Sequence, residues 1–426
     1  MKNIATKCVQ AGYKPKNGEP RVAPIVQSTT FYYETPEEMG DLFDLKKPGY
    51  FYTRLGNPTL GFLEEKMAAL EGGVGAMATA SGMSATLLAI LNLAESGDNF
   101  LSMSTLYGGT YNLFNVTLRK LGVNCRFFGE DATETEIEAL IDDKTRLIFL
   151  ESLANPAMIV ADFQKIKKIA QKHNIVVMVD NTLPTPIICR PFEHGANVIV
   201  HASTKYLDGH ATSVGGIIID DGKFPYLGNP RYPRFNEPDS SYHGMVFARD
   251  VGPAAFITRA RGIGMRDFGA QMAPMNAWLT NLGIETLHLR IARHSANALS
   301  VARALKENPA IEWVKYAGLP SDKYYDRVQK YFDGGMASGM VTFGIKGGRD
   351  AAMKFQKALR LFAIVTHIAD SRSCVLHPAS TTHRQLSASD LDAAGVADNL
   401  IRLSVGIEGE SDILEDVLNA LKVSQE

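Results

Sequence analysis

The sequence has no excess of charge of either sign, few cysteines and no long apolar run. Its 426 residues include 44 basic and 46 acidic side chains, which leaves a formal net charge of −2. Such a balance argues against a surface that coats nucleic acid. The longest apolar stretch, residues 85–94, is shorter than the roughly 18 residues that a membrane span needs. We therefore expect neither a nucleic-acid partner nor a membrane span.

The cysteines are too scattered to form a framework. They are Cys8, Cys125, Cys189 and Cys374, with no Cys-x-x-Cys pair. A disulfide-stapled fold or a structural zinc site would need closer or paired spacing. We expect buried thiols in a reducing compartment and no metal. The first residues lack the apolar core of a secretory signal, so the expected location is the cytoplasm.

What the chain does have is the composition of a globular protein. Apolar residues make up 45% and charged residues 21%, which is ordinary for a folded domain. The length suggests two or three domains, or one large α/β domain with a smaller partner. We predict a proline-punctuated, extended arm over residues 1–60, a large domain over 61–258 and a smaller C-terminal α/β domain over 259–426.

Short apolar strands alternate with helices through the middle of the chain. The predicted strands cover residues 123–128, 147–150, 175–179, 198–200 and 217–219, with further strands at 340–345 and 401–405. The predicted helices include an apolar one over residues 85–94, capped by Ser81, and an amphipathic one after Asp162. Continuous apolar strands separated by amphipathic helices indicate a parallel sheet that is covered on both faces.

Polar side chains follow three of these strands. Open α/β sheets bind ligands at the carboxyl ends of their strands. There the sequence places Asn155, Asp180 and Lys205. Taken singly, Lys205 could be a surface lysine and Asp180 a turn residue. Together, a lysine amine and an acid partner for a ring nitrogen are what pyridoxal phosphate (PLP) requires.

A phosphate site is also expected before the apolar helix. Ser81-Gly82-Met83 precedes it, and N–H groups at a helix N-terminus suit a phosphate, although the same residues could form an ordinary cap. The sequence contains no Gly-x-x-x-x-Gly-Lys-Ser/Thr motif, which argues against an ATP-binding loop. The glycine pairs at 73–75 and 262–264 lack the third glycine of a dinucleotide fingerprint.

Eight short motifs, in order along almost the whole chain, resemble the PLP-dependent Cys/Met metabolism family. They lie at residues 52–59, 81–83, 107–111, 151–156, 179–182, 203–206, 377–380 and 402–406. The resemblance implies a fold-type-I, aminotransferase-like architecture: a large α/β domain with a mostly parallel sheet and a smaller C-terminal α/β domain. It also implies a homotetramer built of catalytic dimers.

The resemblance implies a role for each matching residue. Lys205 would be the Schiff-base lysine, and Asp180 would pair with the pyridine nitrogen. Tyr107 would stack on the ring and assist proton transfer. Asn155 would contact the cofactor or the substrate, and Arg402 would bind the substrate carboxylate. Tyr107 could instead be a core residue and Arg402 a solvated arginine on the outer face of its strand.

The cofactor phosphate has its own set of expected ligands. They are Gly82, Met83, Ser203 and Thr204 of one subunit, with Tyr52 and Arg54 reaching across from its neighbour. Tyr52 and Arg54 could equally be plain interface residues. Many relatives have a serine three positions before the lysine, where this chain has Ala202. Whether Ser203 replaces that serine stays open at this point.

The remaining motifs resemble one branch of the family. Residues 241–244, 266–269 and 377–383 point to enzymes that replace the acetate of O-acetylhomoserine by sulfide, a transferase reaction that yields homocysteine for methionine synthesis. The alternatives are a methionine or cystathionine γ-lyase, an O-succinylhomoserine sulfhydrylase or cystathionine γ-synthase, an aminotransferase, and a scaffold without activity. Gly109 stands where γ-lyases often have cysteine, which weakens the lyase alternative.

Overall fold

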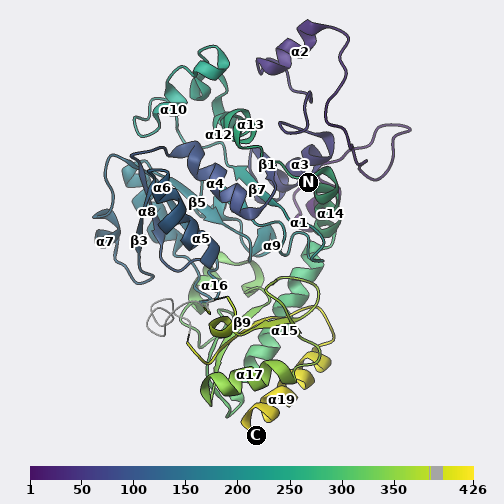
Figure 1. Ribbon diagram of the computed structural model, residues 1–426, viewed down its shortest axis with the longest axis vertical. Helices are drawn as coiled ribbons and strands as arrows, with labels where there is room; N and C mark the ends of the chain where they lie inside the picture. Colours follow the sequence, from purple (N-terminus) through teal and green to yellow (C-terminus); the bar gives the residue numbers. More distant parts are fainter. Residues whose placement is uncertain (383, 385–396) are drawn as a thin grey trace.

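The structure is a computed structural model and describes residues 1–382, 384 and 397–426. A larger α/β part carries one sheet and a smaller part carries a second (Figure 1). The long helix α15 (Leu287–Glu307) runs from the larger part into the smaller one, and the C-terminus lies at the far end of the smaller part (Figure 1).

In the described part of the chain, seven strands form the larger sheet, in the order β1-β7-β6-β5-β4-β2-β3. Their bounds are β1 Gly75–Thr79, β2 Asn99–Met103, β3 Asn124–Phe128, β4 Thr145–Glu151, β5 Val176–Asp180, β6 Val198–His201 and β7 Gly216–Asp220. β7 runs antiparallel to both β1 and β6, and the other neighbours pair in parallel. The expected, mostly parallel sheet is confirmed.

The central strand β5 shows why its sequence is apolar without alternation. Val177 and Val179 pack into one hydrophobic core, whereas Val176 and Met178 pack into a second core on the opposite face. A strand that is buried on both faces needs apolar side chains at every position. Asp180, at the carboxyl end, is the first residue to break this run.

Helices cover both faces of the larger sheet. Those before β7 are α3 Pro58–Glu71, α4 Gly82–Leu93, α5 Gly108–Asn112, α6 Leu118–Lys120, α7 Glu134–Glu138, α8 Phe163–His173 and α9 Thr185–Ile188. Those after it are α10 Pro233–Asn236, α11 Phe247–Asp250, α12 Ala255–Arg259, α13 Arg266–Phe268 and α14 Pro274–Glu285. Ser81 and Asp162 cap α4 and α8 as predicted, each accepting a backbone N–H with its side-chain oxygen.

The smaller sheet has the order β10-β11-β12-β9-β8 within the described residues. Its strands are β8 Ile311–Lys315, β9 Met340–Ile345, β10 Ala363–Ile364, β11 Cys374–Leu376 and β12 Leu400–Ser404. Helices α16 (Tyr325–Tyr331), α17 (Gly348–Ala358) and α19 (Glu410–Gln425) complete this part. The strand predicted over 340–345 is β9, and the one predicted over 401–405 is β12, shifted by one residue.

The N-terminal residues are divided between core and surface. Helix α1 (Ile4–Gln10) packs against the body and buries Cys8 completely. The segment that follows extends away from the body and carries α2 (Pro36–Phe43) at its far end (Figure 1). Tyr32 in this segment is 87% exposed, which is unusual for an aromatic side chain.

The expectations about a membrane span and about the cysteines can be compared with the described residues. Within them, no helix combines the length and apolar character that crossing a membrane requires. The four cysteines all lie in the described part and are free thiols: three are buried, and Cys125 is half-buried.

Candidate functional site

Asp180 lies at the carboxyl edge of the larger sheet, beside Glu151 of the neighbouring strand β4. Its Oδ1 accepts hydrogen bonds from the Thr182 backbone N–H, at 2.9 Å, and from the Thr182 hydroxyl. That hydroxyl in turn accepts the N–H of Ala202 at 2.8 Å. Burial raises the pKa of Asp180, while the Thr182 hydrogen bonds and the charge of His201 oppose the rise. The carboxylate is thereby fixed to the segment that carries Lys205.

Glu151 belongs to the same edge and was not among the predicted site residues. Its side chain is buried, and Oε1 accepts the backbone N–H of Tyr107 at 2.7 Å. Burial raises the pKa of Glu151, and the charge of Asp180 raises it further. Of the two carboxyls, Glu151 is therefore the one that we expect to hold a proton. The sequence signal was an acidic residue directly after an apolar strand.

Lys205 follows β6, as predicted, and faces the smaller sheet. Burial lowers the pKa of Lys205 to about 8, and the charge of Arg402 contributes in the same direction. Arg402 lies on β12 with only 9% of its surface exposed, and its Nη2 donates to the carbonyl of Thr366 at 3.3 Å. It is not an outward-facing, solvated arginine. The fold thus places an amine with a lowered pKa, from the loop after β6, near a buried guanidinium of the smaller sheet.

The N-terminus of α4 lies at the same sheet edge. The Ser81 hydroxyl accepts the N–H of Ser84 at 3.1 Å, which leaves the preceding amides of the first turn without an intrahelical acceptor. A Cβ on Gly82 would lie 2.6 Å from the Cβ of Ala202, so only glycine fits here. The amides of Gly82 and Met83 therefore lie at an open helix N-terminus, where the sequence predicts the phosphate site.

The two hydroxyl residues before Lys205 have different surroundings. Thr204 Oγ1 accepts the N–H of Gly215 at 3.1 Å. Ser203 is fully buried, and its Oγ has no hydrogen-bond partner among the described residues. A Cβ on Gly215 would lie 2.5 Å from that oxygen. Ala202, rather than Ser203, is the residue whose side chain faces Gly82.

Tyr107 stands at the mouth of the site and is not a core residue. The residue is 54% exposed, while its backbone N–H donates to Glu151. A Cβ on Gly109 would lie 2.6 Å from Cε1 of Tyr107. Gly109 therefore leaves room for the tyrosine ring in its present place, and the cysteine that γ-lyases often carry there would displace it.

The other predicted residues lie in two places. Asn155 is buried, and its Oδ1 has no hydrogen-bond partner among the described residues. Arg54 donates to the carbonyl of Arg266 and lies 5.4 Å from the ring centroid of Tyr52. Within one chain, no described contact joins Tyr52 or Arg54 to Lys205. Residue 383, the last of the predicted motif at 377–383, lies outside the described residues.

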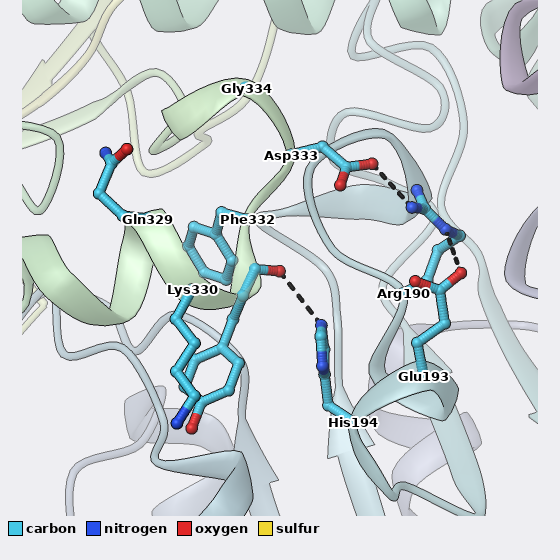
Figure 2. Close-up of a pocket in the computed structure, with 9 residues that line it drawn as sticks. Arg190, Glu193, His194, Gln329, Lys330, Phe332, Asp333 and Gly334 are labelled. Carbon is cyan, nitrogen blue, oxygen red and sulfur yellow. Dashed lines mark hydrogen bonds and ion pairs between the residues drawn. The ribbon is translucent and has the colours of Figure 1, made fainter.

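A separate cavity of about 280 Å³ lies between the residues after α9 and helix α16 (Figure 2). Arg190 forms ion pairs there with Asp333, at 2.7 Å, and with Glu193, at 2.8 Å. His194 Nε2 lies 3.3 Å from the carbonyl of Tyr331. None of the predicted site residues lines this cavity. No group of three or more His, Cys, Asp or Glu side chains suited to a metal ion occurs among the described residues.

A family model described as "Cys/Met metabolism PLP-dependent enzyme" matches residues 5–422. The chain belongs to this family. The match covers both sheets and all of the predicted site residues. The cofactor of the family is PLP, as expected from the joint placement of Lys205 and Asp180.

Curated family members from distant organisms are similar along almost their whole length. An O-acetyl-L-homoserine sulfhydrylase of Leptospira meyeri is 45% identical over 94% of this chain and 92% of its own. The O-acetyl-L-homoserine sulfhydrylase 1 of Thermus thermophilus is 42% identical over 97% and 98%. The homocysteine/cysteine synthase of Saccharomyces cerevisiae is 41% identical over 93% and 91%.

A solved structure extends the likeness to the fold. A Campylobacter jejuni protein, described as an O-acetylhomoserine (thiol)-lyase with N'-pyridoxyl-lysine-5'-monophosphate at position 205, is 40% identical. It superposes with a TM-score of 0.95 over 99% of this chain and 100% of that one. The expected fold-type-I architecture is confirmed.

The residues of this chain fit the family cofactor. The glycine-lined N-terminus of α4 offers amides to a phosphate, and the carboxylate of Asp180 is available to a protonated ring nitrogen. Two buried polar atoms, Ser203 Oγ and Asn155 Oδ1, have no hydrogen-bond partner among the described residues. A bound polar molecule could supply the missing hydrogen bonds. The lowered pKa of Lys205 suits an amine that must be neutral to attack an aldehyde.

Proposed function

We propose that this protein replaces the acetate group of O-acetylhomoserine by sulfide, giving homocysteine and acetate. The observation that carries the proposal is the position of Lys205: its amine, made more acidic by burial, lies between the carboxylate edge of the larger sheet and the buried Arg402 of the smaller one. The names of the curated relatives support the same reaction.

PLP, when bound, forms a covalent bond to an amino group and withdraws electrons from the neighbouring carbon. The part of Lys205 is to take the proton from the α carbon of the substrate and to return it at the end. Asp180 would keep a proton on the ring nitrogen, and the amides of Gly82 and Met83 would hold the phosphate. Tyr107 would lie against the ring and offer its hydroxyl for proton transfer. A second proton leaves Cβ, acetate then leaves from Cγ, sulfide adds at Cγ in its place, and a proton returns to Cβ.

Arg402 is the proposed ligand of the substrate carboxylate. We expect Arg402→Met to raise KM for O-acetylhomoserine about 10- to 100-fold, because a charge-assisted hydrogen bond to a buried guanidinium is worth about 1.5–3 kcal/mol. Arg402→Lys should recover only part of the loss, since lysine lacks the planar fork. Steady-state kinetics at varied O-acetylhomoserine concentration measures both effects.

A control for this variant is Arg349→Met, which also removes an arginine from the smaller part. Arg349 pairs with Asp398 at the surface, where ion pairs contribute little. We expect its KM to stay at the wild-type value. An unchanged KM in Arg402→Met itself would remove Arg402 from the proposed substrate site.

Product analysis tests the reaction directly. The purified protein, loaded with PLP, is given O-acetylhomoserine and sulfide, and parallel reactions contain O-succinylhomoserine and sulfide, O-acetylhomoserine and cysteine, or methionine alone. Homocysteine from the first mixture supports the proposal. Cystathionine from the third, or a 2-oxo acid from methionine as the dominant product, would favour the synthase or the γ-lyase instead.

We further propose a homotetramer of catalytic dimers, in which Tyr52 and Arg54 serve the site of a neighbouring subunit. The support is that Tyr52 is exposed and that the segment before it, which carries α2, extends away from the body and exposes Tyr32 (Figure 1). Light scattering of the purified protein tests the assembly: a monomeric mass with full activity would contradict it.

A further inference from the structure

The residue directly after Lys205 belongs to a buried contact between the larger and the smaller part. The hydroxyl of Tyr206 accepts the backbone N–H of Gly339, which directly precedes β9, at 2.9 Å. The carbonyl of Gly339 accepts the N–H of Val405, directly after β12, at 2.8 Å. Tyr206 and Val405 are completely buried. The tyrosine next to Lys205 is thus linked, through Gly339, to the end of the strand that carries Arg402.

His294 of α15 completes this contact from the other side. Its Nδ1 donates to the carbonyl of Val405 at 2.7 Å, and its ring packs edge-on against the ring of Tyr206, with 5.0 Å between the centroids. Burial lowers the pKa of His294 to about 4, so the imidazole is neutral at pH 7 and has only this one N–H to donate. Each of the four residues Tyr206, Gly339, Val405 and His294 therefore contacts the next, and we call this closed set the joint.

The joint leaves no room for a side chain at Gly339. A Cβ there would lie 2.7 Å from the Tyr206 hydroxyl oxygen, 2.9 Å from the carbonyl oxygen of Val405 and 3.2 Å from Cβ of His294. Glycine therefore lets the three other members meet at one point. A shift of the end of β12 relative to Tyr206 would break at least one of these buried hydrogen bonds, which is costly away from water. The joint thus defines one position of that strand end.

The segment that carries Lys205 is also held by bonds that do not involve the smaller sheet. The N–H of Lys205 donates to the carbonyl of Ala202 at 3.2 Å, and its carbonyl accepts the N–H of Gly209 at 2.8 Å. Arg290 of α15 donates from Nη1 to the carbonyl of Tyr206 at 2.9 Å. Loss of the Tyr206 hydroxyl should therefore leave Lys205 in place and release the end of β12.

The two groups that the joint connects have to act on the same small molecule. Under the proposed function, the amine of Lys205 acts at the α carbon of the substrate, while the guanidinium of Arg402 binds the carboxylate attached to that carbon. The two side chains must therefore keep a fixed separation, although one follows β6 and the other lies on β12. A misplacement of about 1 Å can cost about 100-fold in catalysis.

We propose that Tyr206 and His294 are positioning residues, which fix the end of β12, and with it the guanidinium of Arg402, relative to Lys205. The inference rests on the proposed function, because it assigns the substrate carboxylate to Arg402. Neither residue acts on the substrate or on PLP directly: both act through the backbone of residues 339 and 405, to which they are bonded.

The test compares KM with kcat in Tyr206→Phe, which removes one oxygen atom and keeps the aromatic ring. We expect KM for O-acetylhomoserine to rise about 10-fold, with a smaller fall in kcat, because the guanidinium is displaced from the carboxylate. The affinity for PLP and its visible absorption should stay at the wild-type values, because Lys205 keeps its place. Steady-state kinetics and titration of PLP into the apoprotein measure these quantities.

His294 offers a second variant on the opposite side of the joint. His294→Leu removes the bond to Val405 and should raise KM in the same way. His294→Asn carries an amide N–H close to the position of Nδ1, so we expect it to recover part of the loss.

Tyr316→Phe is the matched control. Tyr316 is also buried, and its hydroxyl lies 3.1 Å from the carbonyl oxygen of Ser295 on α15 and 3.0 Å from that of Ser338, directly before Gly339. It therefore ties the same helix to the same turn, but both of its partners lie outside β12 and outside the segment that carries Lys205. We expect this variant to lower the melting temperature while it leaves KM unchanged.

The double variant Tyr206→Phe/Arg402→Met shows whether Tyr206 acts through Arg402. Residues that act as one unit are not additive, so we expect its KM to match that of Arg402→Met alone within about 2-fold. Two effects that multiply, or a wild-type KM in Tyr206→Phe beside a raised KM in Arg402→Met, would overturn the inference. If Tyr206→Phe does not fold, the same comparisons with His294→Leu decide.

Failure of the proposed function has a different signature. An unchanged KM in Arg402→Met would refute the proposed substrate site, and this inference with it, whatever Tyr206→Phe does. A wild type that converts methionine or O-succinylhomoserine in place of O-acetylhomoserine would refute only the proposed reaction. The KM comparisons are then made with that substrate, because it carries the same α-carboxylate.

Discussion

Lys205→Ala is expected to lose essentially all turnover of O-acetylhomoserine and the visible absorption of covalently held PLP near neutral pH. The amine is proposed both to tether the cofactor and to move the α proton. General acid–base catalysis alone contributes about 10²–10⁴-fold, so the loss of turnover should be at least of this size. Absorbance of the purified protein and a homocysteine assay measure the two effects.

The pH dependence of cofactor uptake follows from the same residue. Burial lowers the pKa of Lys205 to about 8, below that of an ordinary lysine. About a tenth of the amine is then neutral at pH 7 and about half at pH 8, against about one part in 3,000 at pH 7 for a solvated lysine. The rate at which the apoprotein captures PLP should therefore rise between pH 7 and pH 9 and level off above that.

The chain offers a second buried lysine as a control. Lys66 on α3 is 5% exposed, and burial lowers its pKa as well. No role at the site is proposed for it. We expect Lys66→Met to keep the absorption band and the turnover. A Lys205→Ala protein with both intact would refute the assignment of the amine.

The sequence predicted best those strands in which every position must be apolar. β4 and β5 are buried on both faces, so their apolar runs stand out. β1 and β2 were missed because their sequences are not of this kind. Gly75–Thr79 consists mainly of small residues, and β2 contains Asn99 and Ser102, whose polar groups bond to Asp142 and to the chain itself. The hydrogen bonds of such buried polar residues are made to partners that a local sequence pattern does not reveal, some of them distant in the chain.

The sequence pattern also did not predict the direction of each strand. Ile217, Ile218 and Ile219 of β7 have the same apolar character as the parallel strands, yet β7 runs antiparallel to its neighbours. The difference comes from its connection. Residues 202–215 contain Lys205 and tight turns but no helix, and a parallel strand would need a longer crossover.

Much of the candidate site followed from one rule, that ligands collect at the carboxyl ends of parallel strands. That rule placed Asp180, Lys205 and Asn155 at one edge. It did not reveal Glu151, because the position of Glu151 at the site depends on its register with Asp180. Tyr52 and Arg54 stay predictions, because their proposed partner is another subunit.

Asp180→Asn is the second change with a large expected effect. The amide can still accept the bonds from Thr182, so the local geometry should persist, but the negative charge beside the ring nitrogen is lost. Loss of a preorganised electrostatic group costs about 10²–10³-fold in kcat. We expect a fall of this size, together with weaker PLP binding, in kinetic and binding measurements on the folded variant.

The stability of the same variant should move in the opposite direction. Burial raises the pKa of Asp180, which means that the ionised carboxylate destabilises the folded apoprotein at neutral pH. Removing it should leave the melting temperature of the apoprotein unchanged or higher while activity falls. A binding site can require a charge that lowers the stability of the fold, whereas a packing role would not explain such a charge.

Asp220→Asn distinguishes this effect from a general response to removing a buried carboxylate. Asp220 lies at the other end of β7, is 1% exposed, and has its pKa raised by burial to about 7. Because the pKa of this carboxyl is raised in the folded state, the free energy of unfolding should fall as pH rises from about 4 to about 7. An amide does not titrate, so the substitution should abolish that fall. This control should therefore gain stability above pH 7 with normal turnover and PLP affinity. If both variants lost activity equally, or if neither did, the charge of Asp180 would not be what the chemistry depends on.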